Sequence, residues 1–146
     1  MIVQLFCNKN TSFFIYNIMP IFNPYGRAIE YPLRCSNGSA AIVTGVDAVA
    51  QAIFQRLGIA YGSLPATPSF GSRLEKILFE PIDSIAVALG ATFIREALRN
   101  EGRINVRSVQ GEIDSTVTGR INFTIEYELR QTEEIQSLVY PFDRQL

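Results

Sequence analysis

The stretch 121-INFTIEYEL-129 decides the fold class of this sequence. Apolar residues occupy the odd positions from Ile121 to Leu129, and polar residues occupy every even position between them. This period of two is typical of a β-strand with one face buried and the other face in solvent. The sequence therefore predicts a strand that contributes one face to a hydrophobic core.

Two further strands are predicted on either side of this one. Alternation begins at Ile104 and continues to about Ile113, and residues 114–119 are typical of a turn. After Glu134 the segment 135–142, IQSLVYPF, predicts a third strand. The chain therefore ends in a small antiparallel sheet.

The first helix is predicted upstream of this sheet, over Thr44 to Leu57. Thr44 and Asp47 have the spacing of a capping box, and Gly58 is a typical helix stop. One face of the helix repeats with a helical period and is expected to be buried. Its members are Val46, Val49, Ala50, Ile53, Phe54 and Leu57.

Two more helices are predicted after a loop over residues 59–70. A short helix starts at Ser72, which has capping-box spacing to Glu75, and Pro81 ends it. A longer helix is capped by Asp83 or Ser84 and runs to about Asn100, with Gly102 placed to end it in a left-handed conformation. Its expected buried stripe is Ile82, Ile85, Leu89, Phe93 and Ala97.

These elements predict an α+β fold, with about three helices packed on a small C-terminal antiparallel sheet. A chain of 146 residues with 47% hydrophobic content can bury one sizeable core. We expect residues 1–42 to form an N-terminal arm and an irregular lead-in segment, and residues 43–146 to form the domain. The arm, residues 1–18, is expected either to dock on a neighbouring protein or to cover its own domain.

Composition excludes several classes of function. The net charge of −1 gives no basic surface for nucleic acid, and no apolar run is long enough to span a membrane. Histidine is absent, and Cys7 and Cys35 lack the spacing of a metal or redox site. We therefore expect no metal and no cofactor.

Candidates for catalysis are limited to scattered carboxylates. A glycosidase needs two carboxyl groups across a cleft, one of them with a raised pKa. The candidate acids carry no further signature, and such residues are usually surface charges or helix caps. They are Glu75, Glu80, Glu101, Glu112 and Asp114. The residues alone therefore give an enzymatic function little support.

Several motifs in one order resemble the baseplate wedge, or sheath-initiator, family of contractile phage tails, which has relatives in type VI secretion baseplates. They are 68-PSFGSRLEKILFEPIDS-84, an acid-x-Arg-Ile junction at Glu101, the strand 121–129 and the closing 138-LVYPF-142. The resemblance covers about Val43 to Phe142.

The resemblance implies a structural role and no catalysis. Family members are similar to the conserved inner domain of the tail sheath subunit, and they present a sheet edge that starts the sheath around the tail tube. The implied partners are other wedge proteins, sheath subunits and, as a further expectation, tail tube or hub proteins. Six copies per virion baseplate, assembled in the host cytoplasm, are expected.

By the same resemblance, Glu101 and Arg103 seat the protein on the other wedge proteins, with Gly102 where the family has proline. The alternative is that Gly102 is only a helix stop and both charges are solvated. Phe70 and Gly71 are candidates for the same contact, or else a turn glycine beside a core phenylalanine.

A second candidate surface is an open sheet edge beside the strand 121–129, which an arm of a sheath subunit could extend. Its expected residues are Ile121, Phe123, Ile125, Tyr127, Leu138 and Tyr140. The two tyrosines could equally be core residues. Two alternative functions stay open, a peptidoglycan-cleaving lysozyme-like enzyme and a baseplate subunit of a type VI secretion system.

Overall fold

The computed structural model describes residues 25–36 and 38–143. The predicted arm over residues 1–18 lies outside them. The chain divides into two compact units, with the boundary between Gln51 and Ala52 inside helix α1 (Val46–Gly58). Among the described residues, no helix is both long enough and apolar enough to cross a bilayer.

The first unit contains two short two-stranded antiparallel sheets where an irregular segment was expected. Strand β1 (Arg27–Ile29) pairs with β4 (Ile42–Thr44), and β2 (Cys35–Ser36) pairs with β3 (Ser39–Ala40). The Gln51 side chain donates to the Ile29 carbonyl at 2.8 Å. Thr44 lies in β4, so the predicted helix start at this residue was wrong by two positions.

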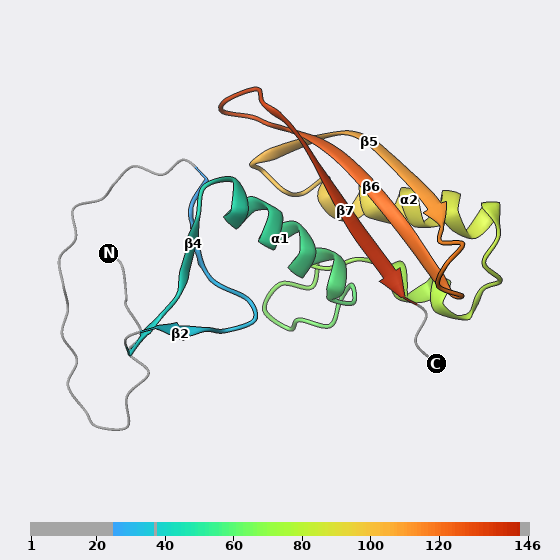
Figure 1. Cartoon of the computed structure of the whole chain (residues 1–146), viewed down its shortest axis with the longest axis horizontal. Helices are drawn as coiled ribbons and strands as arrows, with labels where there is room; N and C mark the ends of the chain where they lie inside the picture. The colour runs from blue at the N-terminus through green and yellow to red at the C-terminus, as the bar shows by residue number, and fades with distance from the viewer. Residues whose placement is uncertain (1–24, 37, 144–146) are drawn as a thin grey trace. The chain divides into compact units, whose positions relative to one another are not determined.

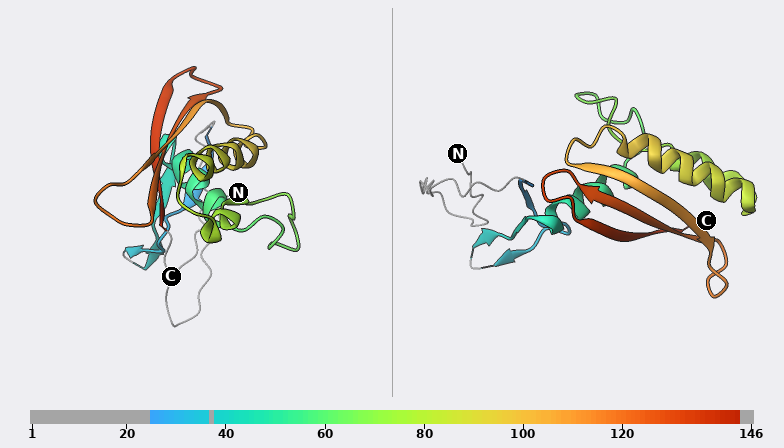
Figure 2. Two further views of the ribbon diagram at one scale, coloured as in Figure 1. Left: turned by 90° about the vertical axis from the view of Figure 1, so that its right-hand side faces the viewer. Right: turned by 90° about the horizontal axis from the view of Figure 1, so that it is seen from above.

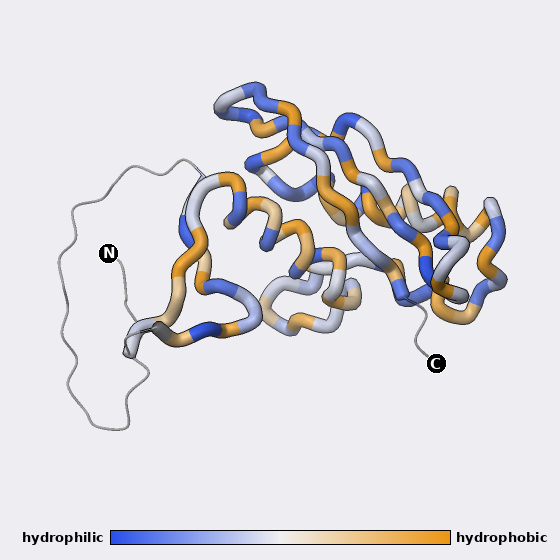
Figure 3. Tube along the Cα trace, in the orientation of Figure 1, coloured by the Kyte–Doolittle hydropathy of each residue, from blue (hydrophilic) through white to orange (hydrophobic). Residues whose placement is uncertain are grey.

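The second unit holds the predicted three-stranded sheet. Its strands are β5 (Ile104–Ile113), β6 (Arg120–Leu129) and β7 (Ile135–Asp143), in the antiparallel order β5-β6-β7 (Figure 1). Figure 3 shows the alternation of hydrophilic and hydrophobic residues along β6. The odd-numbered residues of β6 are buried, which confirms the prediction from its period of two.

Helices cover one face of this sheet, as the α+β class predicts. Helix α2 (Ser84–Leu98) lies along the sheet, and Figure 2 shows the two as separate layers. The α2 residue Gly90 contacts Phe123 of β6. Phe123 pairs in register with Tyr140 of β7. The centroid of the Tyr140 ring lies 5.6 Å from that of Phe54 in α1, with the two rings tilted by 47°. The end of α1 and α2 therefore pack on the same face of the sheet.

Phe123 is enclosed by two glycines. A Cβ atom at Gly90 would lie 2.4 Å from the Phe123 ring, and one at Gly111 of β5 would lie 2.8 Å from it. Real side-chain atoms cannot approach so closely, so each glycine makes room for the ring. This contact sets the close spacing between helix and sheet.

The predicted buried stripe of α2 was wrong at Ile85 and Leu89, although its member Ala97 is buried. Ile85 is 73% exposed and Leu89 is 38% exposed. The close approach to the sheet selects the face that carries Gly90, and Ile85 and Leu89 lie off that face. The buried residues are Ala86, Gly90, Ala91, Ile94, Ala97 and Leu98.

The N-terminal ends of α2 and of the short helix before it are capped differently. Asp83 caps α2 as predicted, because its carboxylate accepts from the amides of Ile85 and Ala86. The short helix η1 (Leu74–Phe79) is a 3-10 helix without a side-chain cap. The Ser72 hydroxyl instead donates to the Leu57 carbonyl at 2.7 Å, so it satisfies the end of α1.

Gly102 does not end α2, which was predicted to run to about Asn100. The helix stops at Leu98, and the Glu101 amide then bonds to the Leu98 carbonyl at 3.0 Å. Gly102 is not among the glycines with positive φ. The helix is therefore closed by a tightened turn and not by a left-handed glycine.

Candidate functional site

The turn between α2 and β5 carries a buried carboxylate. Glu101 is only 8% exposed, and its Oε1 accepts from Nε of Arg103 at 2.6 Å. Its Oε2 lies 3.5 Å from Nη2 of Arg56, which comes from the last turn of α1. The structure therefore excludes the solvated alternative for Glu101 that the sequence left open.

Arg56 joins this turn to the loop that precedes η1. Its guanidinium lies 4.5 Å from the centroid of the Phe70 ring, a cation–π contact. Phe70 is half-buried, and Arg56 is 9% exposed. Three residues predicted for the wedge contact, Phe70, Glu101 and Arg103, are thus brought together by Arg56, and we call these four residues the Glu101 cluster.

Arg56 was missed by the sequence analysis, although a signal was present. It follows Val49 and Ile53 at the spacing i, i+4 and i+7, which places it on the buried face of α1. A charged residue at such a position requires a buried partner of opposite charge. Among the described residues, Nε of Arg56 is the buried side-chain nitrogen without a hydrogen-bond partner.

The electrostatics of the Glu101 cluster keep the carboxylate ionised. Burial alone raises the pKa of Glu101, but the hydrogen bond from Arg103 and the charges of Arg103 and Arg56 outweigh it. The net effect is a pKa below the ordinary value. Glu101 is therefore ionised at neutral pH and lies between the guanidinium groups of Arg56 and Arg103.

Gly71 and Gly102 play different local roles. Gly71 has φ 113°, and a Cβ there would lie 2.6 Å from the Ile59 carbonyl oxygen, so the tight return of this loop requires glycine. Gly102 is exposed, with open space around the position of a Cβ. Gly71 thus shapes the loop that carries Phe70, whereas Gly102 faces outward beside Arg103.

The expectation of an open edge beside the strand 121–129 was wrong. Strand β6 is the middle strand and pairs with β5 on one side and β7 on the other. Four residues assigned to that edge are core residues, each 2% exposed or less. They are Ile121, Phe123, Ile125 and Tyr127.

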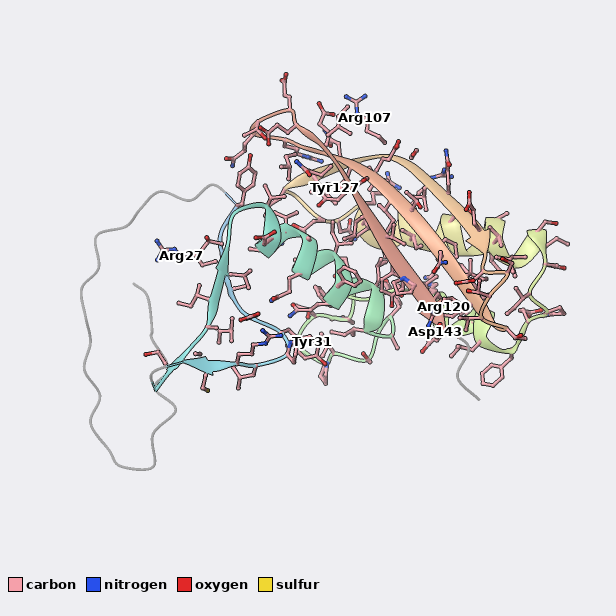
Figure 4. The ribbon with its side chains drawn as sticks, viewed as in Figure 1. Arg27, Tyr31, Arg107, Arg120, Tyr127 and Asp143 are labelled. Carbon is pink, nitrogen blue, oxygen red and sulfur yellow. The ribbon has the colours of Figure 1, made fainter. Side chains whose placement is uncertain are left out.

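The edges of the sheet are β5 and β7. On β7, Leu138 and Tyr140 are half-buried on the helix-covered face, because they pair with Ile125 and Phe123. Val139, on the opposite face, is 54% exposed. Figure 4 shows Arg120 and Asp143 directed toward one another, and this ion pair fastens the end of β7 to β6.

Two of the described carboxyl groups have a shifted pKa. The carboxyl groups with a shifted pKa are Glu101 and Asp114, and both are shifted downward. Hydrogen bonds from the Thr116 hydroxyl and amide lower the pKa of Asp114, in the β5–β6 turn, to about 2. Within the described residues, no three His, Cys, Asp or Glu side chains are placed to hold a metal ion.

Two solved structures are similar to this chain. A protein from Geobacter sulfurreducens described as a tail lysozyme is 31% identical, with a TM-score of 0.65 over 73% of this chain and 98% of that one. The baseplate of the anti-feeding prophage contains a chain that is 19% identical, with a TM-score of 0.57 over 83% of this chain and 87% of that one. The second similarity shows the fold alone.

Sequence comparison identifies the family. A search among curated proteins finds no match. Residues 43–134 match the family described as baseplate wedge protein gp25, which is more than half of the chain. The chain belongs to the baseplate wedge protein gp25 family and is a structural component of a tail baseplate.

Proposed function

We propose that this protein starts the sheath of a contractile tail by offering the β7 edge of its sheet to a strand of the first sheath subunits. The observation that carries the proposal is a long, regular edge strand on a well-packed domain. Strand β7 has nine residues and pairs with β6 without a register shift. An incoming strand gains backbone hydrogen bonds along this length, except from Pro141, which has no N–H to donate.

The two edges of the sheet are not equivalent. In β5 the pairing with β6 shifts between Val106 and Ser108, so Arg107 forms a bulge. Bulges bend and twist a strand, and they are a common protection of sheet edges against pairing. Strand β7 has no such shift, and its Ile135 and Val139 are exposed apolar residues that a partner could cover. The edge beside β7 is therefore the better template.

The Glu101 cluster supports a second part of the proposal, the seating of the protein on other wedge proteins. Glu101 is buried, so we infer that it holds the turn in place from inside. The Arg103 side chain is 33% exposed, and Gly102 beside it is also exposed. These two residues are the ones that a partner can reach. Six copies per baseplate, placed around the tail tube, complete the proposal.

A pair of substitutions on one row of the sheet tests the sheath contact. Thr124 of β6 lies between Gln110 of β5 and Val139 of β7, and both neighbours are exposed. We expect Val139→Lys to remove most of the sheath polymers that carry this protein at one end, because a lysine on an edge disfavours strand addition. The measurement is co-expression with the sheath protein of the same tail, followed by electron microscopy.

Gln110→Lys is the matched control, since it adds the same charge to the other edge of the same row. Both variants should keep the stability of the parent, because exposed substitutions usually change it by less than about 0.5 kcal/mol. Equal loss of end-bound polymers in both variants, or in neither, would count against β7 as the sheath contact. Deleting β7 is a poorer test, since the deletion would also remove Tyr140, which packs against Phe54 of α1.

The lysozyme alternative has one observation in its favour, the description of the Geobacter protein. The site does not support it in this chain. Arg103 and Arg56 stabilise the ionised form of Glu101, whereas a general acid needs a carboxyl group that keeps its proton near neutral pH. We propose that the protein is not an enzyme. A role in the baseplate of a type VI secretion system would use the same two surfaces.

A further inference from the structure

The described arginines of the second unit fall into two groups. Five of them pair with carboxylates in the described part of the chain, namely Arg56, Arg73, Arg103, Arg107 and Arg120. Arg95, Arg99 and Arg130 have no such ion pair with any described residue. All three line the same surface pocket, which has a volume of about 310 Å³.

The floor of this pocket is apolar. Leu98 of α2 and Ile104 of β5 are almost fully buried, and Val106 beside them is half-buried. No Asp or Glu lines the pocket. The three guanidinium groups therefore stand around an apolar floor without an anion to balance their charge.

Two of these arginines are held in place by backbone groups. Nη2 of Arg95 donates to the Val109 carbonyl at 3.3 Å, and Nε of Arg130 donates to the Ile104 carbonyl at 3.2 Å. A guanidinium has five N–H donors, so each keeps most of its donors for another partner. These hydrogen bonds hold both guanidinium groups in place beside strand β5.

A purely structural explanation accounts for only part of this arrangement. Arg95 and Arg99 lie at the C-terminal end of α2, where the helix dipole favours positive charge. Arg130 follows the end of β6, so the α2 dipole does not explain its presence at the same pocket. Convergence of unpaired arginines from two elements indicates a site for an anionic ligand.

We propose that this pocket binds an acidic segment of a neighbouring protein, with carboxylates on the arginines and an apolar side chain against the half-buried Val106. Arginine forms bidentate pairs with carboxylates, and the floor matches an apolar residue between two acids. A nucleic acid is a poorer match, because it needs an extended basic surface and this chain has a net charge of −1. The proposal rests on the proposed function only for the identity of the partner, another baseplate protein.

Peptide binding to the purified full chain tests this proposal without any baseplate. The probe is a fluorescein-labelled peptide of alternating glutamate and leucine, and its control replaces every glutamate by glutamine. We expect saturable binding of the acidic peptide, measured by fluorescence anisotropy, that weakens with salt. Arg99→Gln should weaken binding about tenfold, since it removes a charge-assisted hydrogen-bond donor from the pocket.

Lys76→Gln is the matched control for loss of one positive charge. Lys76 is exposed on η1 and does not line the pocket, so binding should stay unchanged. Arg99 makes no side-chain hydrogen bond in the described residues, so Arg99→Gln should also keep the melting temperature of the parent.

Three results would overturn the proposal. They are absence of binding at millimolar peptide, equal weakening by Arg99→Gln and Lys76→Gln, and equal binding of the glutamine peptide. Tighter binding of an oligothymidylate than of the acidic peptide would assign the pocket to nucleic acid instead. None of these results depends on sheath assembly, so failure here and failure of the sheath proposal can be told apart.

Discussion

Replacement of Glu101 by glutamine should lower the free energy of unfolding by about 3 kcal/mol, because it leaves Arg56 buried without its anion. The side chain keeps its size, so the loss comes from charge and not from a cavity. The Arg56 side chain is only 11% exposed, so water cannot replace the carboxylate. Urea unfolding of the parent and the variant measures the difference.

Glu96→Gln is the matched control for this prediction. Glu96 also pairs with an arginine, Arg73, at 2.9 Å, but its side chain is 53% exposed. Exposed pairs contribute about 0–1 kcal/mol, so this variant should stay close to the parent. Equal effects of the two substitutions would contradict the claim that the buried ion pair of Glu101 stabilises the fold.

The pH dependence of stability gives the same prediction a second readout. The pKa of Glu101 is lowered by folding, so its contribution is present above the unfolded-state pKa of about 4.3 and disappears as pH falls through the folded-state value. The parent should therefore lose stability in acid more steeply than Glu101→Gln. Parallel curves for the two proteins would argue against an ionised Glu101.

Phe123→Ala should cost about 3–5 kcal/mol in free energy of unfolding, the other large effect that the structure predicts. The ring is fully buried and fills the space that Gly90 and Gly111 leave between α2 and the sheet. No neighbour can collapse into that space without moving the helix, so a cavity remains. Denaturant unfolding monitored by circular dichroism measures the loss.

The control for Phe123→Ala is Phe79→Ala. Phe79 is 82% exposed at the end of η1, so its removal should change stability by about 0.5 kcal/mol or less. If Phe123→Ala were as mild as this control, the spacing between α2 and β6 would not depend on the ring. The sheet would then lack the firm support on which an edge-strand template depends.

The sequence was sufficient for the class of fold and for most elements. The period of two along residues 121–129 identified β6 because one face of a half-buried strand must be apolar. The face of α2 could not be identified in the same way, because apolar residues surround this helix. Only the contact of Gly90 with Phe123 shows which side approaches the sheet.

The predicted sheet edge was wrong, although the sequence contained the information needed to place it correctly. Three strands joined in order by short turns form a meander, in which the second strand lies in the middle. The alternation of β6 is therefore that of a central strand, and the open edges belong to β5 and β7. Leu138 and Tyr140 stay predictions for the sheath contact, since they lie on β7.

The candidate wedge contact was predicted in part. Glu101 and Arg103 were found from a motif, but their burial was not, because it depends on Arg56 forty-five positions earlier in the chain. The one indication of this burial in the sequence was Arg56, a charged residue on the apolar face of α1. The division into residues 1–42 and 43–146 also stays a prediction.

Hydrogen–deuterium exchange of this protein, alone and bound to the start of a sheath, tests the central claim most directly. The outward amides of an edge strand exchange with solvent until another strand pairs with them. We predict new protection within Ile135–Asp143 on sheath binding, and none along Ile104–Ile113. Protection of β5 with β7 unchanged would contradict the claim that β7 is the edge on which the sheath begins.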